Sequence, residues 1–505
     1  MALNADSITH GPWWKGVRYD IPVEEVGTDE LSDMENTRVG SGGQVAVRPG
    51  TLSYKSASAI SGTPTITMAA EFDQNATTTH VVIVAGNAIY KYDSGWSAIT
   101  GSVTVTAADD NTWEWANCNG TLVATNGADT DAWKWTGSSN ATVLDDDGRF
   151  TKGKHLAWWD NRLWIGNVNG ATNQLWYSDT AAIETWDATS YINFGGIVTG
   201  ITPSQSALVV HTDDGIYTLT ATGNATVPYK PLKRTQRSGL DGRSCITLPN
   251  DVQMLVREDG IYAWSGGSQI TKISQALDGG YWPNINTARL HKAFAGYFPR
   301  EKEVWFALPY GGVGQTNMNH VMVLGEYTDT ESGQTLHRWH GPYTGWERNC
   351  FALIDQKPHL GGFSGVLWDH DDSGYDDGTS AINASFETGG TAPLGDDLRV
   401  KWLNARHLFD GQGDYSITVS QSGSDLSGTT QSLNIDGGGF ILDQSSLDLT
   451  KLYVSRQVPR ETALQGFGPH ASVRISMNAN DQTFSHRKIM MRFKPLGRYR
   501  TATAA

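Results

Sequence analysis

The chain has 505 residues, with 53 acidic against 38 basic side chains and a formal net charge of −15. It is longer than a single compact core usually is, so two or more domains are expected. A protein that grips the nucleic acid backbone is expected to be basic over a large surface, and the acid excess disfavours that class. No run approaches the roughly 18 apolar residues of a membrane span, so no membrane span is expected.

The composition also narrows the fold and the compartment. The 56 glycines and 19 tryptophans, with only 39% hydrophobic residues, are typical of many short strands, tight turns and large aromatic anchors. The three cysteines, Cys118, Cys245 and Cys350, are odd in number and far apart in the sequence. They disfavour a disulfide framework or a metal knuckle, and they favour assembly in a reducing cytoplasm.

Residues 1–42 are predicted to form an N-terminal arm. Trp13 and Trp14, beside Pro12, indicate an anchor against another surface, and residues 24–35 are acidic with weak helical spacing. Two interpretations stay open. The arm is either an ordered strap over its own propeller or an intersubunit contact.

Residues 43–378 are predicted to form a β-propeller. The segments LVVHTDDGIYTL (208–219) and QMLVREDGIYAW (253–264) repeat one hairpin pattern, in which an Asp-Gly turn joins two apolar runs. Looser copies occur at 81–92, 121–135, 155–166, 293–308 and 357–370, with a mean spacing of about 46 residues. A period in the forties with strand content is typical of four-stranded propeller blades. Seven copies predict about seven blades, with six or eight as alternatives because propellers often close by sharing strands between the chain ends.

The acidic stretch after the last hairpin matches the opening of a calcium loop. Asp369, Asp371 and Ser373 stand at positions 1, 3 and 5, Gly374 at position 6 and Asp377 at position 9. Position 12 is Ser380 rather than a bidentate Glu. The stretch is therefore either a calcium site or an acidic solvent turn, and no other cofactor is expected.

Residues 379–505 lack the repeat and are predicted to form a separate antiparallel β-sheet or sandwich. Segments such as KWLNARHLFDGQGDYSITV (401–419) alternate as strands do. The last segment is basic. Its side chains are predicted to contact acidic groups of a neighbouring subunit, and they are Arg487, Lys488, Arg492, Lys494 and Arg498.

The sequence offers little that would support catalysis. It has no phosphate-binding glycine loop, HExxH, GxSxG or metal-spaced histidine pair, and lone histidines such as His155 and His211 are interpreted as structural. The chain is therefore predicted not to be an enzyme. Propeller active sites gather residues from several blades at the axis, so the alternative is a carbohydrate-active or carbohydrate-binding propeller. Examples are a tail depolymerase, a sialidase-like hydrolase and a host-surface receptor-binding module. An axial pocket lined by Arg and paired acids would favour it.

Four segments, GGQVAVRPGT (42–51), 175–223, 367–389 and 401–419, carry a resemblance. Together they look like the propeller tail proteins of short-tailed bacteriophages, namely the tail nozzle (tail tubular protein B) and its packaged-DNA stabilisation relatives. The resemblance implies a homohexameric ring in the virion tail, below the portal and the tail adaptor. Such a ring extends the DNA channel, retains packaged DNA and carries attachment surfaces for tail fibres or spikes.

The acid excess adds an expectation about the channel. A conduit has to let viral DNA slide, and a basic wall would bind its phosphates. The DNA is therefore expected to pass without specific binding, through a predominantly acidic lumen. The basic segments at 230–243 and 487–500 are expected to face protein partners instead.

Overall fold

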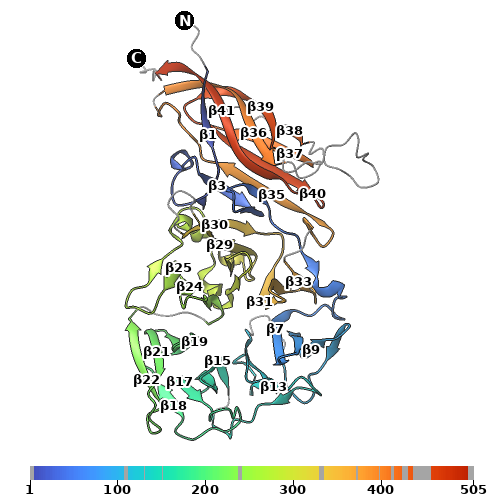
Figure 1. The fold of residues 1–505 in the computed structure, drawn as a ribbon, viewed down its shortest axis with the longest axis vertical. Helices are drawn as coiled ribbons and strands as arrows, with labels where there is room; N and C mark the ends of the chain where they lie inside the picture. Colours follow the sequence, from blue (N-terminus) through green and yellow to red (C-terminus); the bar gives the residue numbers. More distant parts are fainter. Residues whose placement is uncertain are drawn as a thin grey trace.

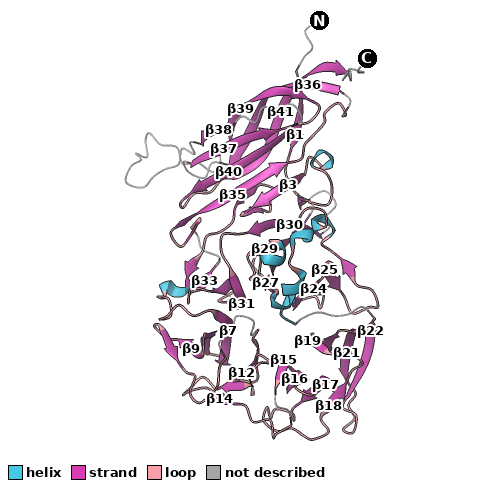
Figure 2. Cartoon of the chain, turned by 180° about the vertical axis from the view of Figure 1, so that it is seen from behind, coloured by secondary structure: helices cyan, strands magenta, loops and turns pink. Residues whose placement is uncertain are grey.

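The computed structural model describes residues 5–106, 112–129, 131–149, 152–236, 242–328, 335–370, 374–396, 398–410, 415–423, 430–435 and 457–498. Within them the regular secondary structure is almost entirely β-strand, as predicted, with a propeller at one end of the molecule and a second β domain at the other (Figure 1). The helices are short 3₁₀ turns, several of which lie where the two parts meet (Figure 2). They are η1 (Val23–Glu25), η2 (Tyr54–Ser56), η3 (Gly242–Ser244), η4 (Gln275–Leu277), η5 (Trp282–Asn284), η6 (Thr287–Lys292) and η7 (Gly312–Gly314).

The propeller has seven antiparallel four-stranded blades. The first three are β7 (Ile66–Asn75) to β10 (Trp96–Ala98), β11 (Glu114–Asn117) to β14 (Thr142–Val143), and β15 (Gly153–Trp159) to β18 (Tyr191–Asn193). The next three are β19 (Val198–Pro203) to β22 (Tyr229–Thr235), β23 (Cys245–Thr247) to β26 (Thr271–Lys272), and β27 (Phe294–Phe298) to β30 (Thr335–Tyr343). The seventh is β31 (Arg348–Ile354), β32 (Lys357–Gly362), β33 (Leu367–Asp369) and β6 (Leu52–Ser53).

The first strand of each blade lies at the centre of the ring. Each of these seven strands contacts the corresponding strand of the next blade, and β31 of the seventh blade contacts β7 of the first. The ring closes because β6, which precedes blade one in the sequence, pairs with β33 as the outermost strand of blade seven. Large apolar side chains fill the wedges between neighbouring blades. The interfaces from blade seven through blade four each have a core of their own, whereas blades five and six share one core with the second domain.

The predicted hairpins are present, but they do not occupy the same place in every blade. In five blades the hairpin joins the second and third strands, as β20 (Leu208–Thr212) and β21 (Gly215–Ala221) do in blade four. In blades three and six it joins the first and second strands, β15 with β16 (Arg162–Val168) and β27 with β28 (Glu303–Leu308). This shift of one strand explains why the spacing in the sequence is irregular around a regular fold.

The second domain is a sandwich of two sheets. One contains β3 (Glu30–Glu35), β35 (Ser380–Thr388), β40 (Ser472–Ala479), β37 (Tyr415–Ser422) and β38 (Thr430–Ile435), with β34 (Asp376–Asp377) beside β35. The other contains β39 (Gln457–Gly468), β36 (Leu398–Asp410), β41 (Ser485–Arg498), β5 (Val45–Val47) and β4 (Thr37–Val39), with β1 (Asp6–His10) paired to β41. Phe386 and His486, one from each sheet, have ring centroids 5.4 Å apart in the core between them.

The N-terminal residues form part of this sandwich instead of the predicted arm. β1, β3, β4 and β5 all pair within it, so the sandwich is built from both ends of the chain and the propeller is inserted between them. The chain leaves and returns at one place, where the Gly50 N–H donates to the Gly374 carbonyl at 2.9 Å. The predicted boundaries at 42 and 378 are replaced by this arrangement, because the partners of the first strands lie more than 300 residues away in the sequence.

One sheet runs through both domains. The short strand β2 (Gly16–Val17) pairs in parallel with β30 of blade six on one side and with β3 of the sandwich on the other. Blade six and the first sandwich sheet therefore form a single 11-stranded sheet. A stack of Tyr19, Tyr281, Tyr310 and His320, with neighbouring ring centroids 5.9, 4.9 and 4.2 Å apart, covers the same junction.

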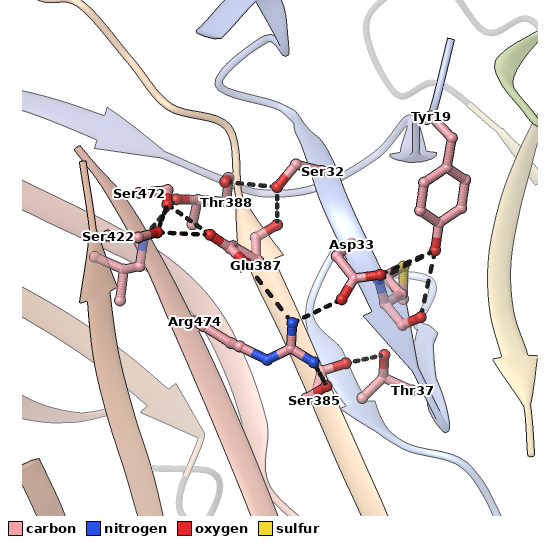
Figure 3. Close-up of polar contacts among 12 residues, drawn as sticks. Tyr19, Ser32, Asp33, Thr37, Ser385, Glu387, Thr388, Ser422, Ser472 and Arg474 are labelled. Carbon is pink, nitrogen blue, oxygen red and sulfur yellow. Dashed lines mark hydrogen bonds and ion pairs between the residues drawn. The ribbon is translucent and has the colours of Figure 1, made fainter. Parts of the chain in front are cut away.

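Polar contacts hold β3 onto the C-terminal strands (Figure 3). Arg474 of β40 pairs with Asp33 of β3 (Nη1 to Oδ2, 2.8 Å) and donates to the Ser385 hydroxyl at 2.7 Å. Its other neighbour, Glu387, accepts from Ser472 (2.6 Å) and Ser422 (3.0 Å). Both partners of Arg474 are partly exposed, so these ion pairs add little to the free energy of unfolding. Their main effect is to align the strands.

Candidate functional site

The main candidate site is a cavity on the propeller axis, with a volume of about 470 Å³. All seven innermost strands or the residues beside them contribute to its wall, so it lies where the blades converge. Its volume is within the range of small-molecule sites, which are typically ~300–1,000 Å³. We call it the axial cavity.

The wall of the axial cavity is largely aromatic. Trp113, Trp115 and Trp158 come from blades two and three, and Phe294 and Phe351 from blades six and seven. Trp113 is buried, whereas Trp115, Trp158 and Phe351 are half-buried and leave ring surface open to the cavity. Such rings can stack on the apolar face of a sugar or pack against an apolar ligand group.

Two charged side chains face these rings. Among the described lining residues, Glu114 is the one carboxylate and Arg243 the one cation. Glu114 accepts from His155 (Nδ1 to Oε1, 2.7 Å) and from the Leu156 N–H (3.0 Å). Arg243 donates to the carbonyls of Asn349 (2.9 Å) and Lys292 (3.2 Å).

A cysteine also lines the cavity but is poorly suited to act as a nucleophile. Cys245 lies 3.5 Å from Nε2 of His211, which also contacts the Gln253 side-chain oxygen at 3.1 Å. Burial raises the pKa of the Cys245 thiol to about 12 and lowers the pKa of His211 to about 4. At neutral pH both groups are therefore uncharged, and no thiolate forms without a change in this environment.

The axial cavity is suited to binding more than to hydrolysis. Glycoside hydrolysis usually needs two carboxylates placed on either side of the scissile bond. Among the described residues that line this cavity only Glu114 can serve, and His155 already holds it. A pocket with an arginine and paired acids would favour an enzyme. The axial cavity has the arginine, Arg243, but its described lining residues include one acid and not a pair.

The basic segment at 230–243 is expected to face protein partners, but its last residue, Arg243, lines the axial cavity instead. The turn η3 directs it inward, and β22 carries the exposed basic residues of that segment, such as Lys230. The position of η3 directly before β23, the innermost strand of blade five, could have indicated this, because residues beside innermost strands line the axis.

The predicted calcium residues have other partners where the structure describes them. Asp377 receives both ends of the Arg48 guanidinium (Nη1 to Oδ1, 2.9 Å; Nη2 to Oδ2, 2.6 Å) and accepts from Thr51 at 3.1 Å. Asp369 lies 3.5 Å from Nζ of Lys357. Asp371 and Ser373 lie outside the described residues, and within the described ranges no three His, Cys, Asp or Glu side chains are grouped as metal ligands are. The calcium site remains a prediction.

The two predicted tryptophan anchors have different surroundings. Trp13 is completely buried in the sandwich core, 5.4 Å from Phe386 and 5.2 Å from His486 between ring centroids. It has no surface to offer another subunit, so the intersubunit interpretation does not hold for it. Trp14 is half-buried and stacks on Tyr327 at 6.0 Å, and its role as an interface residue stays a prediction.

The predicted basic interface becomes an extended surface in three dimensions. Lys488, Arg492 and Lys494 of β41 project from the outer face of the sandwich and are exposed. Lys401 and Arg406 of β36 join them, because Lys401 lies opposite Lys494 and Arg406 opposite Met490. We call these five residues the basic face. Arg487 instead pairs with Asp410 (Nε to Oδ1, 2.6 Å), and the side chain of Arg498 lies outside the described residues.

The basic face carries its charges without local compensation. None of its five cations has an ion pair within the parts of the chain that the structure describes. Lys401 and Lys494 even stand directly opposite one another, where like charges destabilise a sheet. In an acidic protein, such a surface is fit for an acidic partner.

No helix in the described residues has the length and apolar character that a membrane crossing requires. No protein-family model matches the sequence, and no curated protein matches it significantly. Among solved structures, the chain is similar to the extracellular domain of a one component system from B. thetaiotaomicron, with 9% identity and a TM-score of 0.42 over 74% of this chain. It spans 56% of that chain's length.

Two further solved structures are similar at the same low level. Virginiamycin B lyase from Staphylococcus aureus has 11% identity and a TM-score of 0.40, over 63% of this chain and 97% of the lyase. The exo-beta-1,3-galactanase from Phanerochaete chrysosporium has 10% identity and a TM-score of 0.27, over 84% of this chain and 95% of the galactanase.

Proposed function

We propose that the chain is a structural subunit of a short-tailed bacteriophage tail, a nozzle protein that assembles as a homohexameric ring around the DNA channel. The observation that carries this proposal is the 11-stranded sheet that joins blade six to the sandwich. A binding module tethered to an anchor domain needs no such continuity. A ring wall does need it, because the wall has to keep its shape while DNA under pressure passes through.

Two further features support the structural role. The sandwich takes strands from both ends of the chain, so the described structure has no separate domain that could swing away from the propeller. The basic face offers an exposed surface that can dock on an acidic protein such as a tail adaptor, a fibre or a spike. The resemblance of four sequence segments to tail nozzle proteins points the same way.

The proposal is tested by assembly on particles. Purified chain is mixed with phage particles that carry the adaptor but lack a nozzle, and the bound copies are counted by cryo-electron microscopy. Six copies around a through-channel are expected, and three or twelve copies, or no binding, would contradict the proposal. A variant with Lys488→Glu, Arg492→Glu and Lys494→Glu should fold, because these side chains are exposed, yet dock less well. The matched control is Lys230→Glu on the outer strand of blade four.

A second candidate function is carbohydrate binding by the propeller. The aromatic wall of the axial cavity favours it, because Trp115, Trp158 and Phe351 present ring surface beside hydrogen-bonding groups. A glycan array probed with the purified chain tests this function. Binding that survives in the variant with the charge-reversed basic face and disappears on Trp115→Ala would favour it over the nozzle role.

A further inference from the structure

The axial cavity presents two opposite charges that do not pair with each other. The ion pairs of the described residues include neither Arg243 with Glu114 nor Arg243 with any other carboxylate. Glu114 stands on β11 of blade two and Arg243 directly before β23 of blade five, and both line the same cavity. The cavity therefore separates a cation and an anion across a space that a ligand can enter.

Arg243 keeps donors that the protein does not use. A guanidinium has five N–H groups, and the carbonyls of Asn349 and Lys292 accept from Nη1 and Nη2. Its Nε has no hydrogen-bond partner. Arg243 is partly buried and has no carboxylate partner among the described residues, and a ligand carboxylate would supply one.

Glu114 keeps acceptor capacity. Each carboxylate oxygen can accept about two hydrogen bonds, and the two oxygens accept one each, from His155 and from the Leu156 N–H. These two contacts fix the orientation of the carboxylate, and its side chain remains 16% exposed. An ammonium group could therefore bind Glu114 without displacing either contact.

Between the charges the wall is apolar. Phe294 lies beside Arg243, with the guanidinium carbon 5.9 Å from the ring centroid, and Trp115, Trp158 and Phe351 complete the aromatic surface. A ligand that satisfies the whole cavity thus has a carboxylate, an ammonium group and an apolar or aromatic side chain. A zwitterion of this kind leaves the charge of the cavity unchanged, whereas a simple acid or amine adds an uncompensated charge.

We propose that the axial cavity binds a free α-amino acid with an aromatic side chain, whose carboxylate pairs with Arg243 and whose ammonium group pairs with Glu114. This inference goes beyond the nozzle role and does not depend on it. A ring subunit can carry such a site in each propeller, and the loss of one function leaves the other in place.

The test uses three probes that differ by one group each. L-phenylalanine has both charges, 3-phenylpropanoate lacks the ammonium group, and phenethylamine lacks the carboxylate. Isothermal titration of the full chain should show L-phenylalanine binding about ten- to a hundred-fold more tightly than either truncated probe, the usual effect of a charged hydrogen bond. No heat with L-phenylalanine at millimolar concentration, or equal affinity for the three probes, would overturn the proposal.

Two variants assign the charges. Glu114→Gln should remove the preference for L-phenylalanine over 3-phenylpropanoate and keep its preference over phenethylamine. Arg243→Gln should remove the preference for L-phenylalanine over phenethylamine and keep its preference over 3-phenylpropanoate. Arg243→Lys should restore binding in part, and Lys230→Gln is the surface control. If Arg243→Gln fails to fold, because it loses two contacts to backbone carbonyls, Glu114→Gln decides alone. Equal losses of affinity for all three probes would contradict the assignment. Binding of glucose in place of L-phenylalanine would also contradict it, and would favour the second candidate function.

Discussion

Several histidines are enclosed so completely that they stay neutral in the folded chain. Burial lowers the pKa of His10 and His211 to about 4 and that of His407 to about 3. The unfolded chain takes up these protons below pH 6.5, whereas the folded chain does so only near pH 4 or lower. The free energy of unfolding is therefore expected to fall as the pH drops from 6.5 towards 4.

His486 gives the sharpest test of this residue-scale effect. Its ring lies among Trp13, Phe386 and Phe409, both of its nitrogens lack partners, and burial lowers its pKa far below the usual value. We expect His486→Phe to reduce the loss of stability between pH 7 and pH 4.5 by about 3 kcal/mol, measured by denaturant unfolding at both pH values. His337→Gln, at an exposed position of β30, is the control, and an equal effect there would contradict the explanation.

The ion pair between Arg48 and Asp377 separates two interpretations of the acidic loop. Arg48 is almost fully buried, with 2% of its side chain exposed, so removing its partner leaves a buried cation. Asp377→Asn should therefore lower the free energy of unfolding by about 3 kcal/mol with or without a chelator. If the chelator destabilises the parent chain and not the variant in thermal unfolding, Asp377 binds calcium and the ion pair is secondary.

At this scale the sequence allowed only part of the site to be predicted. Reading His155 and His211 as structural histidines fits their contacts with Glu114 and Gln253. The partnership of Glu114 with His155 could not be found, because the two residues are 41 positions apart and meet only when blades two and three stand side by side. The inward direction of Arg243 depends on the same ring closure.

At the scale of elements, a strand of only two residues, β2, connects the two domains. Gly16 of β2 has a φ of +74°, and a Cβ atom there would lie 2.1 Å from the carbonyl oxygen of Trp339 in β30. Only glycine allows the backbones to approach so closely in this conformation. The pairing of β2 with β30 therefore requires glycine at position 16.

Replacing that glycine should loosen the joint. Gly16→Ala combines a left-handed backbone, which costs about 1–2 kcal/mol for an L-residue, with a clash against backbone that cannot move alone. Gly170→Ala is the matched control, since its φ is +82° and nothing lies within 4 Å of the added carbon. Thermal unfolding should show a clearly larger loss for Gly16→Ala. Equal losses would mean that strain alone, and not the close approach, matters at Gly16.

The elements that the sequence predicted well are those with local partners. The Asp-Gly hairpins pair strands that are adjacent in the sequence, so the alternation of apolar residues and the turn are sufficient to indicate them. β1 and β3 pair instead with β41 and β35, far along the chain. Their short alternating segments carry no information about such distant partners, which is why they were predicted as an arm.

At the scale of the whole molecule, the linear division into arm, propeller and C-terminal domain is replaced by an insertion. The sandwich is completed only when residues from both ends meet, and its core is continuous with the cores of blades five and six. The fold class was accessible because repeats and turns are local features. The domain boundaries were not, because they depend on pairing across the full length of the chain.

This architecture leads to a prediction about cooperativity. Two-domain chains often unfold in separate steps, since little surface is shared between the domains. Here a sheet and a core cross the junction, so separating the domains would expose the edge of β30 and the buried side chains of Trp339, Tyr281 and Tyr343. We expect one calorimetric transition for the full chain, with the calorimetric enthalpy equal to the van't Hoff enthalpy.

Fragments provide the complementary measurement. Residues 51–370, which contain all seven blades including β6, should aggregate or unfold at temperatures where the full chain is folded, because blade six loses β2 as its neighbour. Gly16→Ala in the full chain should move the calorimetric profile towards two transitions, and Gly170→Ala should not. Two well-separated transitions in the parent chain, or a soluble fragment that melts cooperatively, would show that the shared sheet does not couple the domains. The proposed nozzle role would then lose the structural observation on which it depends, whereas amino acid binding in the axial cavity could still be measured on the propeller alone.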